Sequence, residues 1–161
     1  MPDTSNDTEP NVRSARYIIV ESKTPCPQCN LVTTVFAFAL PAGYESFCVF
    51  EDDEPGVWEA PGIAATLSYV DHLSEAVTKR IRTITSLYRI DVHHETGESF
   101  WMNHCQHCGA KMEEEELHGE LDGPFGPTPW QGLEVTRLHE VHEPFEGRAD
   151  GESHQLVALD S

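Results

Sequence analysis

The sequence has few basic residues and no apolar run long enough to cross a membrane. Its 161 residues include 10 Lys and Arg against 28 Asp and Glu, which gives a formal net charge of −18. A chain this acidic repels the phosphate backbone of nucleic acids, so we expect no direct binding to DNA or RNA. A transmembrane helix needs about 20 consecutive apolar residues. No stretch of the sequence provides them, so we expect no membrane association.

The first residues also lack the apolar core of a secretory signal. Residues 1–14 read MPDTSNDTEPNVRS, which is polar and acidic. This composition predicts a disordered N-terminal tail on a cytoplasmic protein. Because the cytoplasm keeps thiols reduced, paired cysteines in such a protein are typical of metal sites rather than disulfides.

Familiar catalytic motifs are missing as well. The sequence has no P-loop, no G-x-G-x-x-G and no G-x-S-x-G. TPCPQC supplies the P-C-x-x-C of a zinc deaminase, but that enzyme class carries an H-x-E before it. The H-x-E triplets here, 93–95 and 118–120, both follow. The sequence therefore predicts a protein that is not an enzyme.

Two cysteine pairs with the same two-residue gap are present, one in TPCPQCNL and one in NHCQHCGAK, separated by residues 30–104. A two-residue gap lets a tight turn direct both sulfurs at one ion, while backbone N–H groups point at the sulfurs. Pro27 fixes φ inside the first turn, and Gly109 suits the positive φ that such a turn often needs. Four thiolates complete a tetrahedral structural Zn²⁺ site. The predicted ligands are Cys26, Cys29, Cys105 and Cys108.

These two turns resemble the knuckles of the zinc-ribbon and treble-clef families, which read C-P-x-C and C-x-x-C-G. The resemblance covers the knuckles and the strands beside them, and it implies a zinc-ribbon site in which a hairpin presents one pair against the other. The gap between the knuckles is longer than in a minimal ribbon. The chain also loosely resembles small uncharacterised bacterial proteins with two such pairs, a resemblance that implies no activity.

The other cysteine and the nearby histidines have alternative roles. Cys48, among apolar residues, is expected to be a buried free thiol. A thioredoxin-like dithiol fits poorly, because it uses one pair that opens a helix. His104 and His107 lie on either side of Cys105, and we expect both side chains to point outward rather than to replace a cysteine.

Four further histidines raise the alternative of a second metal in a metal-dependent hydrolase. His139 and His142 are three residues apart in a predicted strand, where such residues point to opposite faces. This weakens them as a chelating pair. The histidines considered for this alternative are His93, His94, His139 and His142.

The basic residues form one modest cluster, which we expect to be a solvated helix face. Lys79, Arg80 and Arg82 lie close together, and Arg89 is near them in the sequence. This stretch is the basis for a third alternative, a zinc-ribbon protein associated with nucleic acid.

Acidic residues concentrate in two places. Residues 113–161 hold 13 acidic and two basic residues, and EDDEPGVWE (51–59) surrounds a tryptophan. Acidic surfaces steer association with basic proteins, and Trp is favoured at binding hot spots. We therefore expect a basic protein partner, as for an inhibitor, an immunity protein or an adaptor. The expected partner-binding residues are Glu51, Asp52, Asp53, Trp58, Glu113, Glu114, Glu115 and Glu116.

The periodicity predicts an α+β fold with an antiparallel sheet and one main helix. Apolar residues three or four apart over 67–84 indicate the helix, with a capping box at 68–71. SLYRIDVHH and SFWMNHC predict a hairpin that delivers the second knuckle. We expect an acidic loop over 51–62, one domain over 15–145 and a weakly ordered acidic tail over 146–161.

Overall fold

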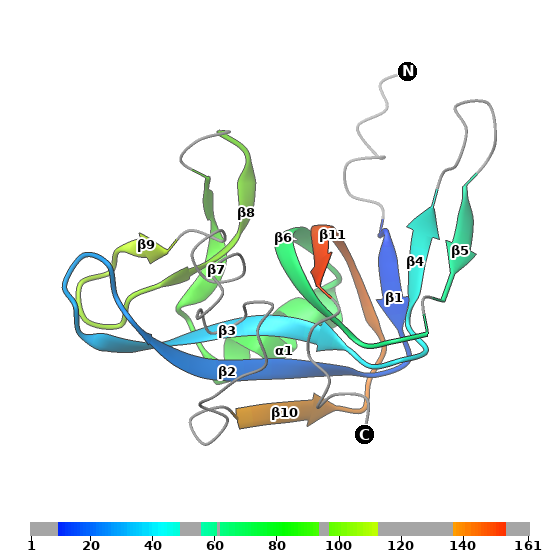
Figure 1. Ribbon diagram of the computed structural model, residues 1–161, viewed down its shortest axis with the longest axis horizontal. Coiled ribbons are helices and arrows are strands. Elements are labelled where there is room, and N and C mark those ends of the chain that lie inside the picture. Colours follow the sequence, from blue (N-terminus) through cyan, green and yellow to red (C-terminus); the bar gives the residue numbers. More distant parts are fainter. Residues whose placement is uncertain (1–9, 49–55, 61, 94–96, 113–136, 154–161) are drawn as a thin grey trace.

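A computed structural model describes residues 10–48, 56–60, 62–93, 97–112 and 137–153. Its larger sheet has eight strands, paired antiparallel in the order β10-β2-β3-β6-β11-β1-β4-β5 (Figure 1). Consecutive buried residues in β2 and β3 show strands that are covered on both faces over much of their length. Their bounds are β1 (Val12–Ser14), β2 (Tyr17–Pro25), β3 (Val32–Leu40), β4 (Glu45–Cys48), β5 (Val57–Glu59), β6 (Ala65–Leu73), β10 (Arg137–Val141) and β11 (Phe145–Ser153).

A second, three-stranded antiparallel sheet has the order β7-β8-β9, and a single described helix precedes it. The helix is α1 (Glu75–Ile84), and the strands are β7 (Tyr88–Val92), β8 (Ser99–His104) and β9 (Lys111–Met112). The predicted β7–β8 hairpin is present, and an α+β chain with antiparallel sheet and one helix is confirmed. In the described part of the chain, no helix combines the length and apolar character needed to cross a bilayer.

Both sheets and the helix share one buried core. The aromatic rings of Tyr17, Phe38 and Phe145 lie 5.2–6.0 Å apart by centroid, and Phe38 also contacts Tyr88 of the second sheet at 5.8 Å. Offset and edge-on ring pairs of this kind add to the free energy of apolar burial. Because β3 and β7 contribute to the same core, the two sheets are held in a fixed relation, which matters for the cysteine pairs at their ends.

The helix is shorter than the sequence predicted. It begins after Ser74, whose hydroxyl accepts a hydrogen bond from the Val77 N–H at 3.4 Å. The predicted first half belongs to β6 instead, in which Tyr69 has a φ of +55° and the register with β11 shifts. A bulge of this kind brings residues three apart to the same side of a strand. Three core residues of β6 consequently imitate helical spacing: Leu67, Val70 and Leu73.

Both expected tails, and the expected acidic loop, contain strands. β11 occupies residues assigned to the C-terminal tail and lies between β6 and β1, while β1 lies within the expected N-terminal tail and β5 within the loop. Few residues of β11 are apolar, because this strand packs closely on β6. A Cβ atom at Gly147 would lie 2.8 Å from the His72 carbonyl oxygen. Glycine is therefore needed where the two strands come this close. It also makes the sequence of β11 less typical of a strand.

Truncation tests the structural role of β11. A chain ending at residue 144 loses the strand that pairs with both β6 and β1, so we expect it to lose cooperative thermal unfolding and to aggregate. A chain ending at Ser153 keeps every described strand and serves as the control. Circular dichroism and melting curves of both chains make the comparison. A 1–144 chain that melts like the full-length protein would contradict this topology.

Candidate metal centre

The first knuckle is the turn that joins β2 to β3. The Asn30 N–H donates to the Cys26 carbonyl oxygen at 2.8 Å, and the Cys26 N–H donates to the Leu31 carbonyl oxygen at 2.9 Å. The Gln28 N–H points at the Cys26 sulfur, 3.3 Å away. Asn30 closes the turn with a φ of +65°, a conformation that asparagine tolerates better than most residues. Cys26 and Cys29 are thereby held at the tip of a long hairpin.

The second knuckle, between β8 and β9, repeats this geometry. The Gly109 N–H donates to the Cys105 carbonyl oxygen at 3.0 Å, and the Cys105 N–H donates to the Ala110 carbonyl oxygen at 2.9 Å. The His107 N–H lies 3.3 Å from the Cys105 sulfur. Gly109 has a φ of +78°, at the position that Asn30 takes in the first knuckle. Both turns therefore have the predicted N–H···S contacts, and the positive φ predicted at Gly109 is present. The positive φ of Asn30 was not predicted.

The structure brings the four cysteines together, although the two knuckles belong to different sheets. The β2–β3 turn lies beside the β8–β9 turn (Figure 1). All four sulfurs lie within 4.8 Å of one another. The Cys26 and Cys108 sulfurs are 3.7 Å apart, as are those of Cys29 and Cys105, far longer than a disulfide bond of about 2.05 Å. Such a cluster could hold a metal ion. Among the described residues it is the one group of three or more His, Cys, Asp or Glu able to do so.

The four thiols perturb one another's ionisation. Burial opposes ionisation of Cys105, but N–H groups of Cys108 and His107 donate to its sulfur and lower its pKa to about 6. At Cys108 the Ala110 N–H acts to lower the pKa, yet burial and the neighbouring sulfurs raise it to about 11. The pKa of Cys29 is raised as well, although the Leu31 N–H opposes the shift. The thiolate of Cys105 thus forms readily because its pKa is lowered. The raised pKa values of Cys29 and Cys108 mean that further thiolates need a compensating cation.

His104 is buried rather than directed outward as predicted. Only 2% of its surface is exposed. Its Nε2 atom lies 2.7 Å from an Asp91 carboxylate oxygen, and its Nδ1 lies 3.0 Å from the Leu87 carbonyl oxygen. The hydrogen bond from His104, followed by that from the Val92 N–H, lowers the pKa of Asp91. Because both ring nitrogens have partners, His104 ties β8 to β7 and leaves the metal site to the cysteines.

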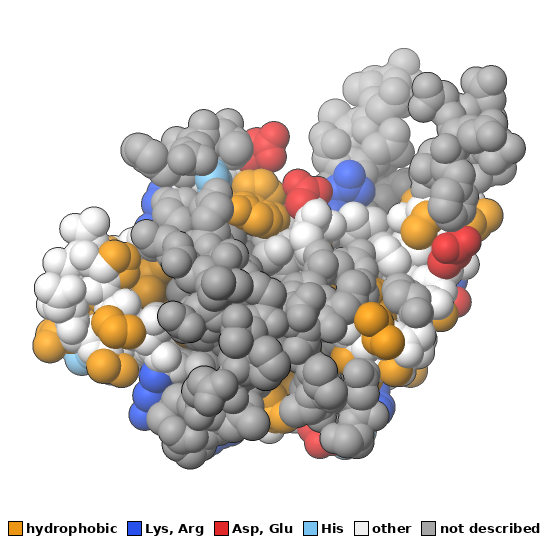
Figure 2. Space-filling model, viewed as in Figure 1, with side chains coloured by type: hydrophobic (Ala, Val, Ile, Leu, Met, Phe, Trp, Pro, Cys, Tyr) orange, Lys and Arg blue, Asp and Glu red, His pale blue; other side chains and the backbone are white. Residues whose placement is uncertain are grey.

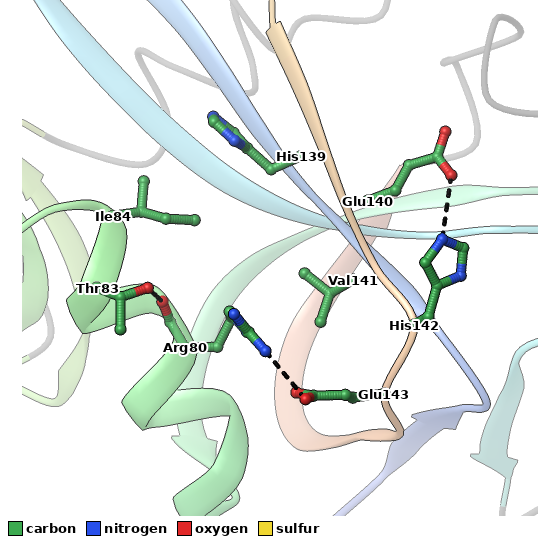
Figure 3. A pocket seen from close by; sticks show the side chains of 8 residues that line it. All are labelled: Arg80, Thr83, Ile84, His139, Glu140, Val141, His142 and Glu143. Carbon is green, nitrogen blue, oxygen red and sulfur yellow. Dashed lines mark hydrogen bonds and ion pairs between the residues drawn. The ribbon is translucent and has the colours of Figure 1, made fainter.

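Of the histidines considered for a second metal, the three that the structure describes do not cluster. In Figure 3, the side chains of His139 and His142 leave β10 in different directions. Both line a pocket of about 400 Å³ between β10 and α1. The His139 Nε2 atom is 2.8 Å from a Glu21 carboxylate oxygen, and the His142 Nε2 atom is 3.8 Å from a Glu140 oxygen. His93 is buried against aromatic rings, and His94 lies outside the described residues.

Two of the four residues in the basic cluster, Lys79 and Arg80, pair with acids. The Lys79 ammonium lies 3.6 Å from Glu75 on the same helix, and the Arg80 guanidinium lies 2.9 Å from Glu143. Arg82 and Arg89 are exposed. Paired cations leave less positive charge for a phosphate backbone, so this surface gives little support to nucleic-acid binding.

Of the expected partner-binding residues, one is described. Trp58 lies on β5, with the Arg13 guanidinium carbon 3.8 Å from its ring centroid and the Phe47 ring edge-on at 5.3 Å. Phe47 and Val57 are exposed beside it, and Figure 2 shows hydrophobic side chains at this end of the molecule. Cys48 on β4 is only half-buried, contrary to expectation, because this hairpin is at the end of the sheet. The predicted acidic residues outside the description are Glu51, Asp52, Asp53, Glu113, Glu114, Glu115 and Glu116.

Comparisons with known proteins do not extend these observations. No protein-family model, no curated protein and no solved structure matches the chain. The similarity to zinc ribbons therefore rests on the two knuckles and their geometry.

Proposed function

We propose that the four cysteines bind one structural Zn²⁺. The spacing of the sulfurs carries this proposal. In a tetrahedron with zinc–sulfur bonds of about 2.3 Å, neighbouring sulfurs are about 3.8 Å apart. The two cross-knuckle distances of 3.7 Å match this edge. The site thus has the ligand number, the ligand type and the dimensions of a four-cysteine zinc centre.

A structural role follows from the ligand set. Catalytic zinc keeps one position open for water or substrate, whereas four thiolates fill all positions. Cys26 and Cys105 are also buried. The ion would join the β2–β3 hairpin to the β8–β9 turn, linking the two sheets. We accordingly propose a non-enzymatic protein of a reducing compartment, the cytoplasm, where the thiols stay available to metal.

Metal analysis tests the choice of zinc. Tetrahedral sulfur sites also suit iron, so the chain should be produced in medium that contains both metals. We expect one zinc and less than about 0.1 iron per chain by elemental analysis. A stoichiometric iron content would contradict the zinc assignment but would leave the four-cysteine centre in place.

We further propose that the protein binds a basic protein partner, as an inhibitor, immunity protein or adaptor would. The net charge of −18 supports this, and four thiolates with one Zn²⁺ add two more negative charges. The surface beside Trp58 supports it locally. Arg13 of the same chain occupies the indole face and the Glu45 carboxylate, whereas Phe47 and Val57 beside them are exposed apolar side chains that a partner could cover.

Capture experiments test the partner proposal. Tagged, zinc-loaded protein is used to capture proteins from its native host at low and high salt, and any captured protein is purified for affinity measurements. We expect a basic partner, and we expect a loss of at least tenfold in affinity when three acids that precede Trp58 in the sequence are neutralised. The test variant is E51Q/D52N/D53N, and the charge-matched control is E75Q/E140Q/D150N. Capture of acidic proteins only, or of none at any salt concentration, would contradict the proposal.

The two alternatives make different predictions. A metal-dependent hydrolase would hold a second metal that can be removed without unfolding. Association with nucleic acid would give a mobility shift with DNA or RNA at low salt. We expect neither result from the zinc-loaded chain. His139 and His142 lie beside different carboxylates, and Lys79 and Arg80 each pair with an acid.

A further inference from the structure

One edge of β3 has no partner strand beside the metal centre within the described residues. β3 pairs with β2 along its whole length, but it pairs with β6 only at Ala39 and Leu40. The edge from Val32 to Phe38 faces the end of β8 and the second knuckle, which belong to the other sheet. Among the described residues, no backbone–backbone hydrogen bond joins β3 to β8. Another interaction must therefore set how the two knuckles meet.

A buried asparagine supplies part of that interaction. The Asn103 side-chain oxygen accepts a hydrogen bond from the Phe36 N–H at 2.7 Å, and its amide nitrogen donates to the Phe36 carbonyl oxygen at 2.9 Å. Asn103 is 0% exposed. One side chain thus satisfies both backbone groups of a strand residue, as a neighbouring strand would. Leaving two buried backbone groups unpaired would be costly, so this contact is favoured over alternative registers.

The same edge is satisfied by side-chain contacts further toward the sulfurs. The Gln106 side-chain oxygen accepts from the Thr34 N–H at 3.3 Å, and His107 Nε2 lies 2.9 Å from the Val32 carbonyl oxygen, to which it donates. Val32, Thr34 and Phe36 are every second residue of β3. The backbone groups of every second residue point to the same side of a strand, so these three present their N–H and C=O groups to one edge. The Gln106 N–H also donates to the Thr33 hydroxyl at 3.0 Å.

We propose that Asn103 is the positioning residue of the metal centre. Its amide fixes β8 against β3 two residues before Cys105, so that both knuckles meet before metal binds. The proposal rests on the four-cysteine metal site proposed above. A site assembled in advance loses less conformational freedom on binding than one ordered by the metal. Removing the contact should therefore reduce metal affinity even where the chain still folds.

The chain offers a matched control. Asn11 makes the same pair of hydrogen bonds with the backbone of Ala149, both at 2.9 Å, away from the knuckles. Asn103→Leu and Asn11→Leu each remove such a pair and replace an amide with an apolar group of similar size. Both should lower stability in the metal-free state. Only Asn103→Leu should lower the affinity for metal, because Asn11 contacts β11 rather than β3.

Zinc affinity of the reduced full-length variants, measured by competition with a chromophoric chelator, tests the proposal. We expect Asn103→Leu to bind zinc 10- to 100-fold more weakly than the parent, the usual range for groups that orient ligands. We expect Asn11→Leu to bind within about twofold of the parent. The Co²⁺ absorption spectrum should change for Asn103→Leu alone, since the geometry of the sulfurs, and not stability, determines it.

Three outcomes are distinguishable. A parent protein that binds no metal would refute the proposed function itself. A parent that binds zinc, with Asn103→Leu equal to it or Asn11→Leu equally weakened, would overturn the positioning role alone. If Asn103→Leu fails to fold, Asn103→Ser decides the matter, because the shorter polar side chain cannot pair with both backbone groups of Phe36. We expect about a 2- to 10-fold weaker affinity for Asn103→Ser, and an unchanged affinity would overturn the proposal.

Discussion

Replacing Cys26 with serine is expected to remove the metal and to lower the melting temperature by about 8–16 °C when free zinc exceeds its Kd a thousandfold. A serine hydroxyl does not ionise near neutral pH and is a poor ligand for zinc. The lost binding free energy is also lost from folding, because the unfolded chain does not hold the four sulfurs together. Cys105→Ser should behave in the same way, since it removes one sulfur of the other knuckle.

Cys48→Ser provides the control for this experiment. Cys48 lies on β4, and its sulfur is 3.7 Å from the Ser46 carbonyl oxygen rather than in the four-sulfur cluster. We expect this variant to keep one metal per chain and to melt within about 2 °C of the parent. Melting curves with and without a chelator measure both effects. A Cys26→Ser variant that melts like the parent would show that the knuckles do not share one structural metal.

Metal affinity is expected to fall at least about 100-fold for each unit decrease in pH near neutrality. All four ligands must be thiolates in the bound state. Cys105, with a pKa of about 6, is largely ionised at neutral pH, whereas the raised pKa values of Cys29 and Cys108, about 11 for the latter, keep these two protonated. At least two protons therefore leave per metal bound, and each proton contributes a tenfold change per pH unit.

The sign and the range of this effect follow from the same pKa values. Since the bound state holds fewer protons, affinity rises with pH and continues to rise until Cys108 ionises near pH 11. Below about pH 6, Cys105 must also lose its proton, and the dependence becomes steeper. Chelator competition at pH 6.5 and 7.5 measures the slope, and calorimetry in two buffers of different ionisation enthalpy counts the protons. A pH-independent affinity would contradict ligation by thiols that must lose their protons to bind the metal.

The parts of the fold that depend on neighbouring residues could be predicted from the sequence. The two-residue gaps determine both knuckles, because the turn geometry involves only residues within and next to each pair. Gly109 indicated the positive φ of the second turn, and Asn30 takes the equivalent conformation in the first. The β7–β8 hairpin was predicted for a similar reason, since its alternating strands are close in sequence.

Features that depend on distant contacts could not be predicted in this way. The bulge in β6 is defined by its pairing with β11, and it gave Leu67, Val70 and Leu73 a helical spacing. β11 contains glycines that its neighbours require, so its sequence resembles a tail. Asn103 carries no local signal at all. Its role depends on the backbone of Phe36, 67 residues away.

His104 shows the same limit at the site itself. Alternation along β8 predicted an outward side chain, but Asp91 and Leu87 provide partners for both ring nitrogens in a buried position. Burying a polar ring is acceptable when its hydrogen bonds are satisfied. Sequence spacing identifies which residues could be ligands, whereas the contacts decide which nitrogen or sulfur atoms remain for the metal.

Counting reactive thiols while zinc is released tests the four-cysteine centre most directly. The chain has five cysteines, of which four form the cluster. We predict that a thiol reagent modifies at most one cysteine, Cys48, in the native protein. After a chelator removes one zinc per chain, all five should react. A native protein in which four or five thiols react at once, or whose thiols become reactive without release of a metal, would contradict the account.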